Sequence, residues 1–443
     1  MSRTVWIIIG VVVAVAVIVG IVVVATDEGE ITESGAGQPS PAATDVSGTV
    51  SVMAVWTGAE QDSFQAVVDA FNETYPDVTV TYNSAGDQLP TVLGTAVEGG
   101  NPPDVAVVPQ PGLMNEYAER GELVPLDFAR DTVDANYSPD WVTLGSFDDQ
   151  FYGLVFKGAN KSTIWYNVNV LTDAGITEPP ASWDELLSAA DTVSASGVPA
   201  WSVAGADGWT LTDWFENVYL RTAGPEMYDQ LAAHEIPWTD QSVVDALTTL
   251  QGVFENKDNI AGNPLQIDFP TSVTQVFNDN PDAGMVYEGD FVQGVILDST
   301  NAQPETDFNV FDFPSIDGSA PAVVGGGDMV IMFNDTPASQ AFVEYLATPE
   351  AAEVWASRGG FSSPNQNVDP NVYPDALTQQ TATALAEAET FRFDMSDLAP
   401  SAFGGTPGQG MWQILQDFLR DPSNPEQTAQ RLESAAADAY GDQ

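Results

Sequence analysis

The chain has 443 residues, 44% of them hydrophobic and 10% aromatic, which is enough to bury the cores of two or three domains and excludes an intrinsically disordered acidic chain. Its 64 acidic residues against 11 basic ones give a formal net charge of −53, spread along the chain, which argues against nucleic acid as a partner. The absence of cysteine excludes disulfides, thiolate metal sites and a lipoprotein anchor.

The first predicted element is a membrane helix within residues 1–25. Residues 5–25 carry no charge, and a run of this length spans a bilayer as a helix. Arg3 precedes the run and acidic residues follow it, which favours an N-terminus inside the cell and the remaining chain outside. Cleavage after Ala25 is the alternative and would release a secreted protein. Residues 26–47, rich in Gly, Ser, Pro and acidic residues, are expected to form a flexible linker.

Alternating strands and helices follow the linker. Residues 49–56, 78–82 and 104–108 have the composition of strands, and apolar residues at helical spacing between 64 and 71 predict a helix after the first of them. This alternation indicates a parallel sheet covered by helices. Ligands of such sheets bind beyond the carboxyl ends of the strands, so the loops after the first and third strands and after strand 285–287 are the expected ligand contacts.

Several helix starts carry capping signals. A helix after Thr348 is expected to end at Gly359 and Gly360. The three predicted starts are Ser182 with Glu185, Thr348 with Pro349, and Asn424 with Gln427.

Six segments resemble, in the same order, the extracellular solute-binding proteins of sugar-importing ABC transporters. The resemblance extends over most of residues 49–443, and the details WTGAEQ and PDVAVVPQPG are similar to the branch associated with α-glucosides. The six segments are VSVMAVWTGAEQDSFQAVVDAFNETYPDVTVTY, GGNPPDVAVVPQPGLMNEYAERGELVPLD, YGLVFKGANKSTIWYNVNVL, PDAGMVYEGDFVQG, VVGGGDMVIMFNDTP and SRGGFSSPNQN.

The resemblance implies a two-lobe α/β fold that binds an oligosaccharide in a cleft between the lobes. It places residues 48–156 and about 316–345 in a first lobe, and residues 157–315 and about 346–443 in a second. It also implies that the lobes close on the ligand and that the closed form docks on an ABC permease. We expect a monomer on the outer face of the cell membrane.

Sugar recognition requires flat aromatic rings against the C–H faces of the sugar, and amides, carboxylates or ammonium groups for its hydroxyls. Trp412 is the leading candidate, since it matches an aromatic residue that stacks on sugar in the family. Trp56 and Glu60 have an equally plain explanation, as a core ring and a first-turn acid of a helix. The predicted ligand-binding residues are Trp56, Glu60, Gln61, Gln110, Lys157, Lys161, Trp209, Asp213, Tyr287, Asp290, Phe291, Asp328 and Trp412.

Lys157 and Lys161 are two of only three lysines in the chain, and they lie four residues apart in a segment expected to cross between the lobes. We predict that they donate hydrogen bonds to the sugar or tie the hinge to acidic groups. Two unremarkable surface lysines are the alternative.

Other functions remain as alternatives. No cofactor or metal is expected, because His234 is the only histidine and cysteine is absent. No catalytic residue is predicted, although a glycoside hydrolase is a rival, as are a two-lobe protein for a polyamine, metal chelate or peptide, and a sensor partner without a transport role. The acidity indicates adaptation to salt or alkaline conditions, with a general solubility bias as the alternative.

Overall fold

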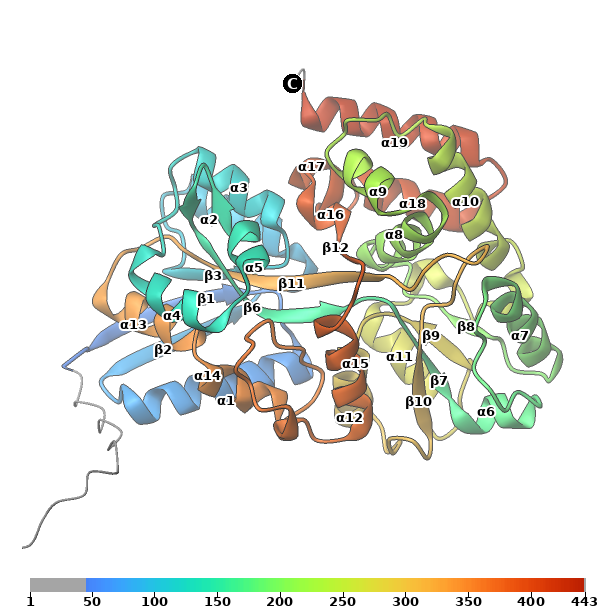
Figure 1. The fold of residues 1–443 in the computed structure, drawn as a ribbon, viewed down its shortest axis with the longest axis horizontal. Helices are drawn as coiled ribbons and strands as arrows, with labels where there is room; N and C mark the ends of the chain where they lie inside the picture. The colour runs from blue at the N-terminus through green and yellow to red at the C-terminus, as the bar shows by residue number, and fades with distance from the viewer. Residues whose placement is uncertain (1–44, 442–443) are drawn as a thin grey trace, which may run out of the picture. The chain divides into compact units, whose positions relative to one another are not determined.

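Two β-sheets organise residues 45–441, the part of the chain that the computed structural model describes (Figure 1). The larger sheet has the order β12-β11-β3-β1-β2, with β6 also paired to β11. The smaller sheet has the order β10-β7-β9-β8. The strands of the larger sheet are β1 (Gly48–Ala54), β2 (Val78–Ser84), β3 (Val105–Val108), β6 (Gly153–Asn160), β11 (Val323–Met332) and β12 (Phe391–Phe393), and those of the smaller are β7 (Thr163–Asn167), β8 (Trp201–Ser202), β9 (Met285–Tyr287) and β10 (Phe308–Asp312); β4 (Ser146–Phe147) and β5 (Gln150–Phe151) form a separate pair.

The prediction of a parallel sheet is correct for β1, β2 and β3, and the pairs β11–β12 and β8–β9 are parallel as well, but both sheets are mixed. β11 runs antiparallel to β3 and β6, and β7 runs antiparallel to β9 and β10. The reason is that the chain crosses between the sheets. β6 leads from the larger sheet to the smaller one, and β11 leads back, so these two long strands lie side by side in opposite directions (Figure 1).

The segment that crosses between the sheets is short and is hydrogen-bonded to the returning strand. Only Lys161 and Ser162 separate β6 from β7. The Lys161 N–H donates to the carbonyl of Val324 at 2.9 Å, and the Val324 N–H donates to Ser162 Oγ at 2.9 Å. These bonds fix the backbone of Lys161 against the returning strand and so determine where its side chain starts.

Helices cover both sheets, and each sheet with its helices forms one lobe. Those packed with the larger sheet include α1 (Gly58–Thr74), α2 (Leu89–Glu98), α3 (Pro111–Glu119), α4 (Arg130–Asn136), α5 (Pro139–Leu144), α13 (Pro337–Leu346) and α14 (Pro349–Ala356). Those of the second lobe include α6 (Val168–Asp173), α7 (Trp183–Ala195), α8 (Trp209–Ala223), α9 (Pro225–Ala232), α10 (Gln241–Phe254), α11 (Phe269–Phe277), α12 (Val292–Ser299), α18 (Gly410–Arg420) and α19 (Pro425–Tyr440). α15 (Ala376–Ala386), α16 (Met395–Leu398) and α17 (Ser401–Gly404) follow the second crossing.

All three capping predictions are confirmed. Ser182 and Glu185 form a capping box, and the side chains of Thr348 and Asn424 accept from backbone N–H groups of the helices that they begin. The helix after Thr348 stops at Ala356, earlier than predicted. It packs on α1, and its Trp355 ring lies 4.7 Å from that of Trp56. This packing places α14 with the first lobe, whereas the family resemblance implied that residues from about 346 to 443 belong to the second.

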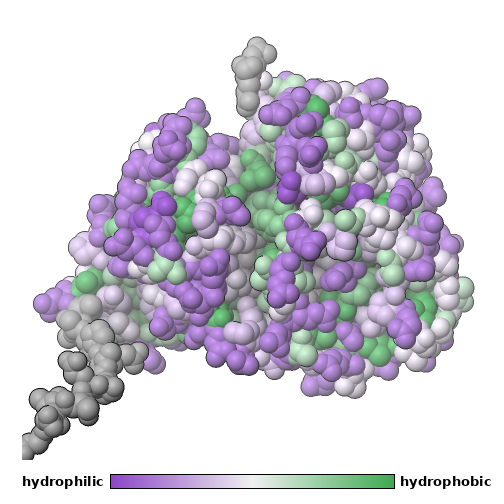
Figure 2. Space-filling model, viewed as in Figure 1, coloured by the Kyte–Doolittle hydropathy of each residue, from purple (hydrophilic) through white to green (hydrophobic). Residues whose placement is uncertain are grey.

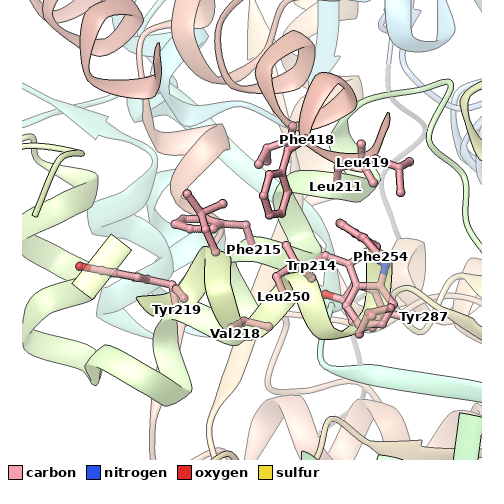
Figure 3. Close-up of a cluster of buried hydrophobic side chains, with 14 of the residues drawn as sticks. Leu211, Trp214, Phe215, Val218, Tyr219, Leu250, Phe254, Tyr287, Phe418 and Leu419 are labelled. Carbon is pink, nitrogen blue, oxygen red and sulfur yellow. The ribbon is translucent and has the colours of Figure 1, made fainter. Parts of the chain in front are cut away.

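The core of the second lobe is built around α8, which is buried on nearly all sides. Trp214 packs against Tyr287 of β9, with ring centroids 4.3 Å apart, and against Phe254 of α10 at 6.1 Å (Figure 3). Burying aromatic side chains of this size contributes roughly 1.5–3 kcal/mol each. α8 is therefore a rigid base for the polar groups at its N-terminal end.

The predicted membrane helix and most of the predicted linker lie outside the described residues. Within residues 45–441, no helix combines the length and apolarity that crossing a membrane requires.

Candidate solute-binding site

A cavity of about 340 Å³ lies between the two lobes and is lined by residues of both. Its volume falls within the range of small-molecule sites. On the face of the molecule seen in Figure 2, apolar residues gather in the recess between the lobes. The predicted binding residues that line the cavity are Trp56, Glu60, Gln110, Lys157, Lys161, Trp209, Phe291, Asp328 and Trp412.

Three predicted contacts instead lie behind the cavity wall and hold the crossing segment. Asp213 Oδ1 accepts from Lys161 Nζ at 3.1 Å. Tyr287 donates from its hydroxyl to the carbonyl of Lys161 at 2.8 Å. Asp290 accepts from the Asn160 N–H at 3.1 Å. The fourth predicted residue outside the lining, Gln61, lies in the first turn of α1. These four residues are therefore not part of the cavity lining.

Trp56 has a buried ring, as the core explanation predicted, and its polar edge lies at the cavity wall. Its ring is 1% exposed and packs against Phe64, with centroids 4.8 Å apart. Its Nε1 donates to Asp328 Oδ2 at 2.6 Å, at the cavity wall. The ring therefore belongs to the core, and its polar edge orients an acid of the site.

Lys157 is buried at the centre of the cavity wall, with 3% exposure. Its Nζ donates to Glu60 Oε1 at 2.6 Å, lies 3.8 Å from Asp328 Oδ2, and is 5.3 Å from the ring centroid of Phe291 in the other lobe. Burial lowers the pKa of this ammonium, but the carboxylates of Glu60 and Asp328 outweigh burial and raise it above its ordinary value. Lys157 therefore carries a positive charge that the neighbouring carboxylates balance.

Lys161 is held by acids on three sides. Its Nζ donates to Asp213 Oδ1 and Asp394 Oδ2 and lies 3.7 Å from Asp397 Oδ2. It also lies 5.8 Å from the ring centroid of Trp209. Burial again lowers the pKa of the ammonium, and the three carboxylates together raise it well above its ordinary value.

The aromatic wall of the cavity comes from three rings of the second lobe. The centroids of Trp209 and Phe269 are 5.4 Å apart, those of Phe269 and Phe291 are 5.3 Å apart, and those of Trp209 and Phe291 are 6.0 Å apart. Trp412, in the first turn of α18, adds a fourth ring to the lining. Gly208 precedes Trp209 with φ +85°, and a Cβ there would lie 2.8 Å from Trp412 Cβ, so glycine is required where these two tryptophans meet.

Two buried polar atoms in the lining have no hydrogen-bond partner among residues 45–441. They are the side-chain oxygen of Gln110, which is 3% exposed, and Nε1 of Trp412, which is 4% exposed. Gln110 is the N-cap residue of α3 and belongs to the first lobe, while Trp412 belongs to the second. An unpaired acceptor and an unpaired donor thus line one cavity from opposite lobes.

Sequence reasoning missed two of the three acids that surround Lys161. Asp394 and Asp397 come from the start of α16, where the Asp394 side chain caps the helix by accepting from the Asp397 N–H. The local pattern Asp-Met-Ser-Asp carries this capping signal, but its partner Lys161 lies 233 residues away, and no local pattern links the two.

A second group of missed acids also lines the cavity. Asp87 comes from the first lobe, and Asp207 and Asp268 come from the second. Burial, opposed by a hydrogen bond from Trp209, raises the pKa of Asp87 to about 6. Burial and the neighbouring Asp87 raise the pKa of Asp207 to about 7. Both groups gain or lose a proton near neutral pH.

Asp213, Glu216 and Asp394 bring carboxylate oxygens within 4.8 Å of one another, a spacing that a metal ion could use. The Lys161 ammonium already bonds two of these residues. Glu216 is engaged by the N–H groups of Met395 and Ser396 at 2.9 and 3.0 Å. We assign no metal to this cluster, because its resident cation is the lysine.

Comparison with known proteins agrees with this geometry. A family model described as bacterial extracellular solute-binding protein matches residues 57–353. The osmoprotective compounds-binding protein GgtB of Synechocystis sp. is 33% identical over 382 residues, covering 84% of this chain and 88% of that protein. The alpha-glucosides-binding periplasmic protein AglE of Rhizobium meliloti is 31% identical over 400 residues, covering 86% of this chain and 85% of that protein.

Solved structures share the same architecture. A chitin oligosaccharide binding protein superimposes with a TM-score of 0.76 at 21% identity, covering 89% of this chain and 99% of that one. The protein RafE in complex with raffinose gives a TM-score of 0.74 at 16% identity, covering 89% of this chain and all of that one, 100%. At these identities the likeness establishes the two-lobe α/β fold.

Proposed function

The chain belongs to the family of bacterial extracellular solute-binding proteins, and we propose that it captures a carbohydrate in the cavity between its lobes and delivers it to an ABC permease. It is a binding protein and not an enzyme, as its sequence predicts, since its family and both named relatives are binding proteins. As a member of an extracellular family, it works on the outer face of the cell membrane.

The pairing of Gln110 and Trp412 carries the proposal. The Gln110 oxygen needs a donor, and Trp412 Nε1 needs an acceptor. A hydroxyl group can act as both donor and acceptor, and a sugar ring carries several hydroxyl groups. The C–H face of the same ring can pack against the aromatic wall. Because the two residues belong to different lobes, one bound sugar would bond both and hold the lobes together.

The charges around the cavity favour a neutral ligand near the lysines. Lys157 and Lys161 are each matched by carboxylates, which leaves neither ammonium free for an anion. The acids that remain without a lysine, Asp87, Asp207 and Asp268, favour a second candidate, a cationic solute such as a polyamine. The raised pKa values of Asp87 and Asp207 weaken that candidate, because these groups are part-protonated near neutral pH.

Among carbohydrates, we propose an α-glucoside oligosaccharide. The support is the resemblance of the WTGAEQ and PDVAVVPQPG segments and the 31% identity with a protein named for α-glucosides. The ligand-binding roles of the lining residues are part of the same proposal.

We also propose that residues 5–25 anchor the protein in the membrane and that the folded part acts as a monomer. The uncharged run is long enough to span a bilayer, and Arg3 orients it with the folded part outside. The net charge of −53 fits a medium of high salt, in which screening weakens the repulsion between carboxylates.

A thermal-shift screen of the full-length protein in high salt tests the proposal. A ligand at about 100 times its dissociation constant adds about 2.7 kcal/mol of stability. We expect maltose, trehalose or a related trisaccharide to raise the midpoint, and spermidine to leave it unchanged. A shift with spermidine alone would favour the cationic candidate, and release of reducing sugar during incubation would indicate a hydrolase.

A further inference from the structure

Glu288 is a buried acid that the cavity lining does not include. It follows β9 and is 1% exposed. Among the described residues, neither of its carboxyl oxygens has a hydrogen-bond partner. An ionised carboxylate in that position would lose its hydration, which is costly in a protein interior unless donors replace the lost water.

The Asp213 carboxyl group on α8 lies near that of Glu288 and is one of the groups that raise the pKa of Glu288. Asp213 is fully buried, its Oδ1 accepts from Lys161 Nζ at 3.1 Å, and its Oδ2 has no partner among residues 45–441. Two carboxyl groups form a hydrogen bond only when one of them carries a proton. A proton on Glu288 gives both Glu288 and Asp213 Oδ2 the partner that each lacks.

The other charged groups in the cluster already have their partners. Asp394 accepts from Lys161, Ser396 Oγ and the Asp397 N–H, and Glu216 accepts from two backbone N–H groups and the Tyr228 hydroxyl. Five carboxyl groups thus surround one ammonium. The titratable groups near Glu288 are Asp213 and Glu216 from α8, Lys161 from the crossing segment, Tyr287 from β9, and Asp394 and Asp397 from α16.

We propose that Glu288 is a positioning residue of the solute site, which keeps its proton, donates it in a hydrogen bond to Asp213 Oδ2, and through Asp213 holds the Lys161 ammonium at the cavity wall. The proposal rests on the proposed function only where it concerns solute affinity. It accounts for a buried acid that does not line the cavity and that would act on the Lys161 ammonium through a single residue, Asp213.

Burial raises the pKa of Asp213 to about 8 and that of Glu288 further above its ordinary range, so the pair holds a proton near neutral pH. Burial and the Asp213 carboxylate raise the pKa of Glu288 well above its ordinary value, against the opposing effects of Lys161 and the Gly289 N–H. A carboxyl pKa raised by folding means that the folded state binds the proton more tightly than the unfolded state does. The stability that this proton supplies is complete at low pH and is lost as pH rises through the folded pKa.

Two substitutions in the full-length protein distinguish the loss of the titratable proton from the loss of the hydrogen-bond donor. Glu288→Gln keeps an N–H donor for Asp213 but has no proton to lose, and Glu288→Leu removes the donor. Glu178→Gln is the matched control, because it makes the same change of charge at an exposed acid of the second lobe.

The first measurement needs no ligand. The infrared spectrum near neutral pH should contain a protonated-carboxyl band component that disappears in Glu288→Gln and persists in Glu178→Gln. As the pH rises above neutral, the unfolding midpoint of Glu288→Gln should fall less than those of the wild type and the control. An unchanged carboxyl band in Glu288→Gln would overturn the proposal.

The second measurement is the affinity for maltose by calorimetry. Glu288→Leu should bind about tenfold more weakly than the control, which is the scale of one hydrogen bond to a charged group, and Glu288→Gln should recover most of that loss. Equal affinity of Glu288→Leu and Glu178→Gln would also overturn the proposal. If Glu288→Leu does not fold, the infrared and pH measurements on Glu288→Gln decide. If no variant binds maltose but the band behaves as expected, the proposed function fails and the proton assignment stands.

Discussion

Replacing Lys157 by Met should destabilise the protein by about 3 kcal/mol. The Nζ of Lys157 is buried and bonds Glu60 Oε1 at 2.6 Å, so its removal leaves Glu60 and Asp328 facing each other without a cation. Breaking a buried ion pair by removing one partner costs about 3–5 kcal/mol. The lower figure applies here, because the side chains of Glu60 and Asp328 retain 27% and 15% exposure and can be partly hydrated.

A double-mutant cycle isolates the interaction itself. Urea unfolding of the full-length wild type, Lys157→Met, Glu60→Gln and the double mutant should give a coupling energy of about 1.5 kcal/mol or more. The matched control is the exposed pair Arg120–Glu122, whose side chains are 50% and 33% exposed, with an expected coupling of about 0.2–1 kcal/mol. If the Lys157–Glu60 coupling is no larger than that of the control, the account of a tightly held cavity lysine is wrong.

Four further outcomes follow from the structure. Trp412→Ala should weaken binding of an α-glucoside by about 2 kcal/mol, or about thirtyfold, by calorimetry, since its ring lines the cavity; a drop in the ligand-free unfolding midpoint with unchanged affinity would make it a core residue. Folding raises the pKa of Asp207 to about 7, so the stability of the wild type should fall as the pH rises through that value. Asp207→Asn should therefore lose less unfolding free energy than the wild type between about pH 5 and about pH 8. Parallel curves of unfolding free energy against pH for the two proteins would contradict this. Lowering salt from about 1 M to about 0.1 M should lower the unfolding midpoint, because a net charge of −53 is then less screened, and an unchanged midpoint would remove the argument for salt adaptation. Removal of residues 1–44 should leave a protein that still binds, because β1 begins at Gly48 and Val46 already packs on the core; loss of binding in high salt would refute it.

Local signals in the sequence predicted local features well. The capping box of Ser182 and Glu185 is formed as predicted, and the rarity of lysine correctly drew attention to Lys157 and Lys161, both of which line the cavity. Asp213, Tyr287 and Asp290 were predicted to contact the ligand but lie behind the cavity wall, because a pattern of residues does not tell which side of a helix or strand end faces the cavity.

Features that depend on distant pairings were not predictable. The antiparallel course of β11 follows from its return between the lobes, and the position of α14 follows from its packing on α1. Asp394 approaches Lys161 across 233 residues, and Asp87 approaches Asp207 from the other lobe. Such contacts are set by the fold as a whole, and a single sequence contains no local trace of them.

The most direct test of the central claim is a crystal structure of the protein with the saccharide that gives the largest thermal shift. The account predicts the sugar in the cavity between the lobes, with hydroxyl groups within hydrogen-bonding distance of the Gln110 side-chain oxygen and of Trp412 Nε1, and a ring face against the aromatic wall. A sugar bound elsewhere, or one that leaves both of these atoms unpaired, would contradict it.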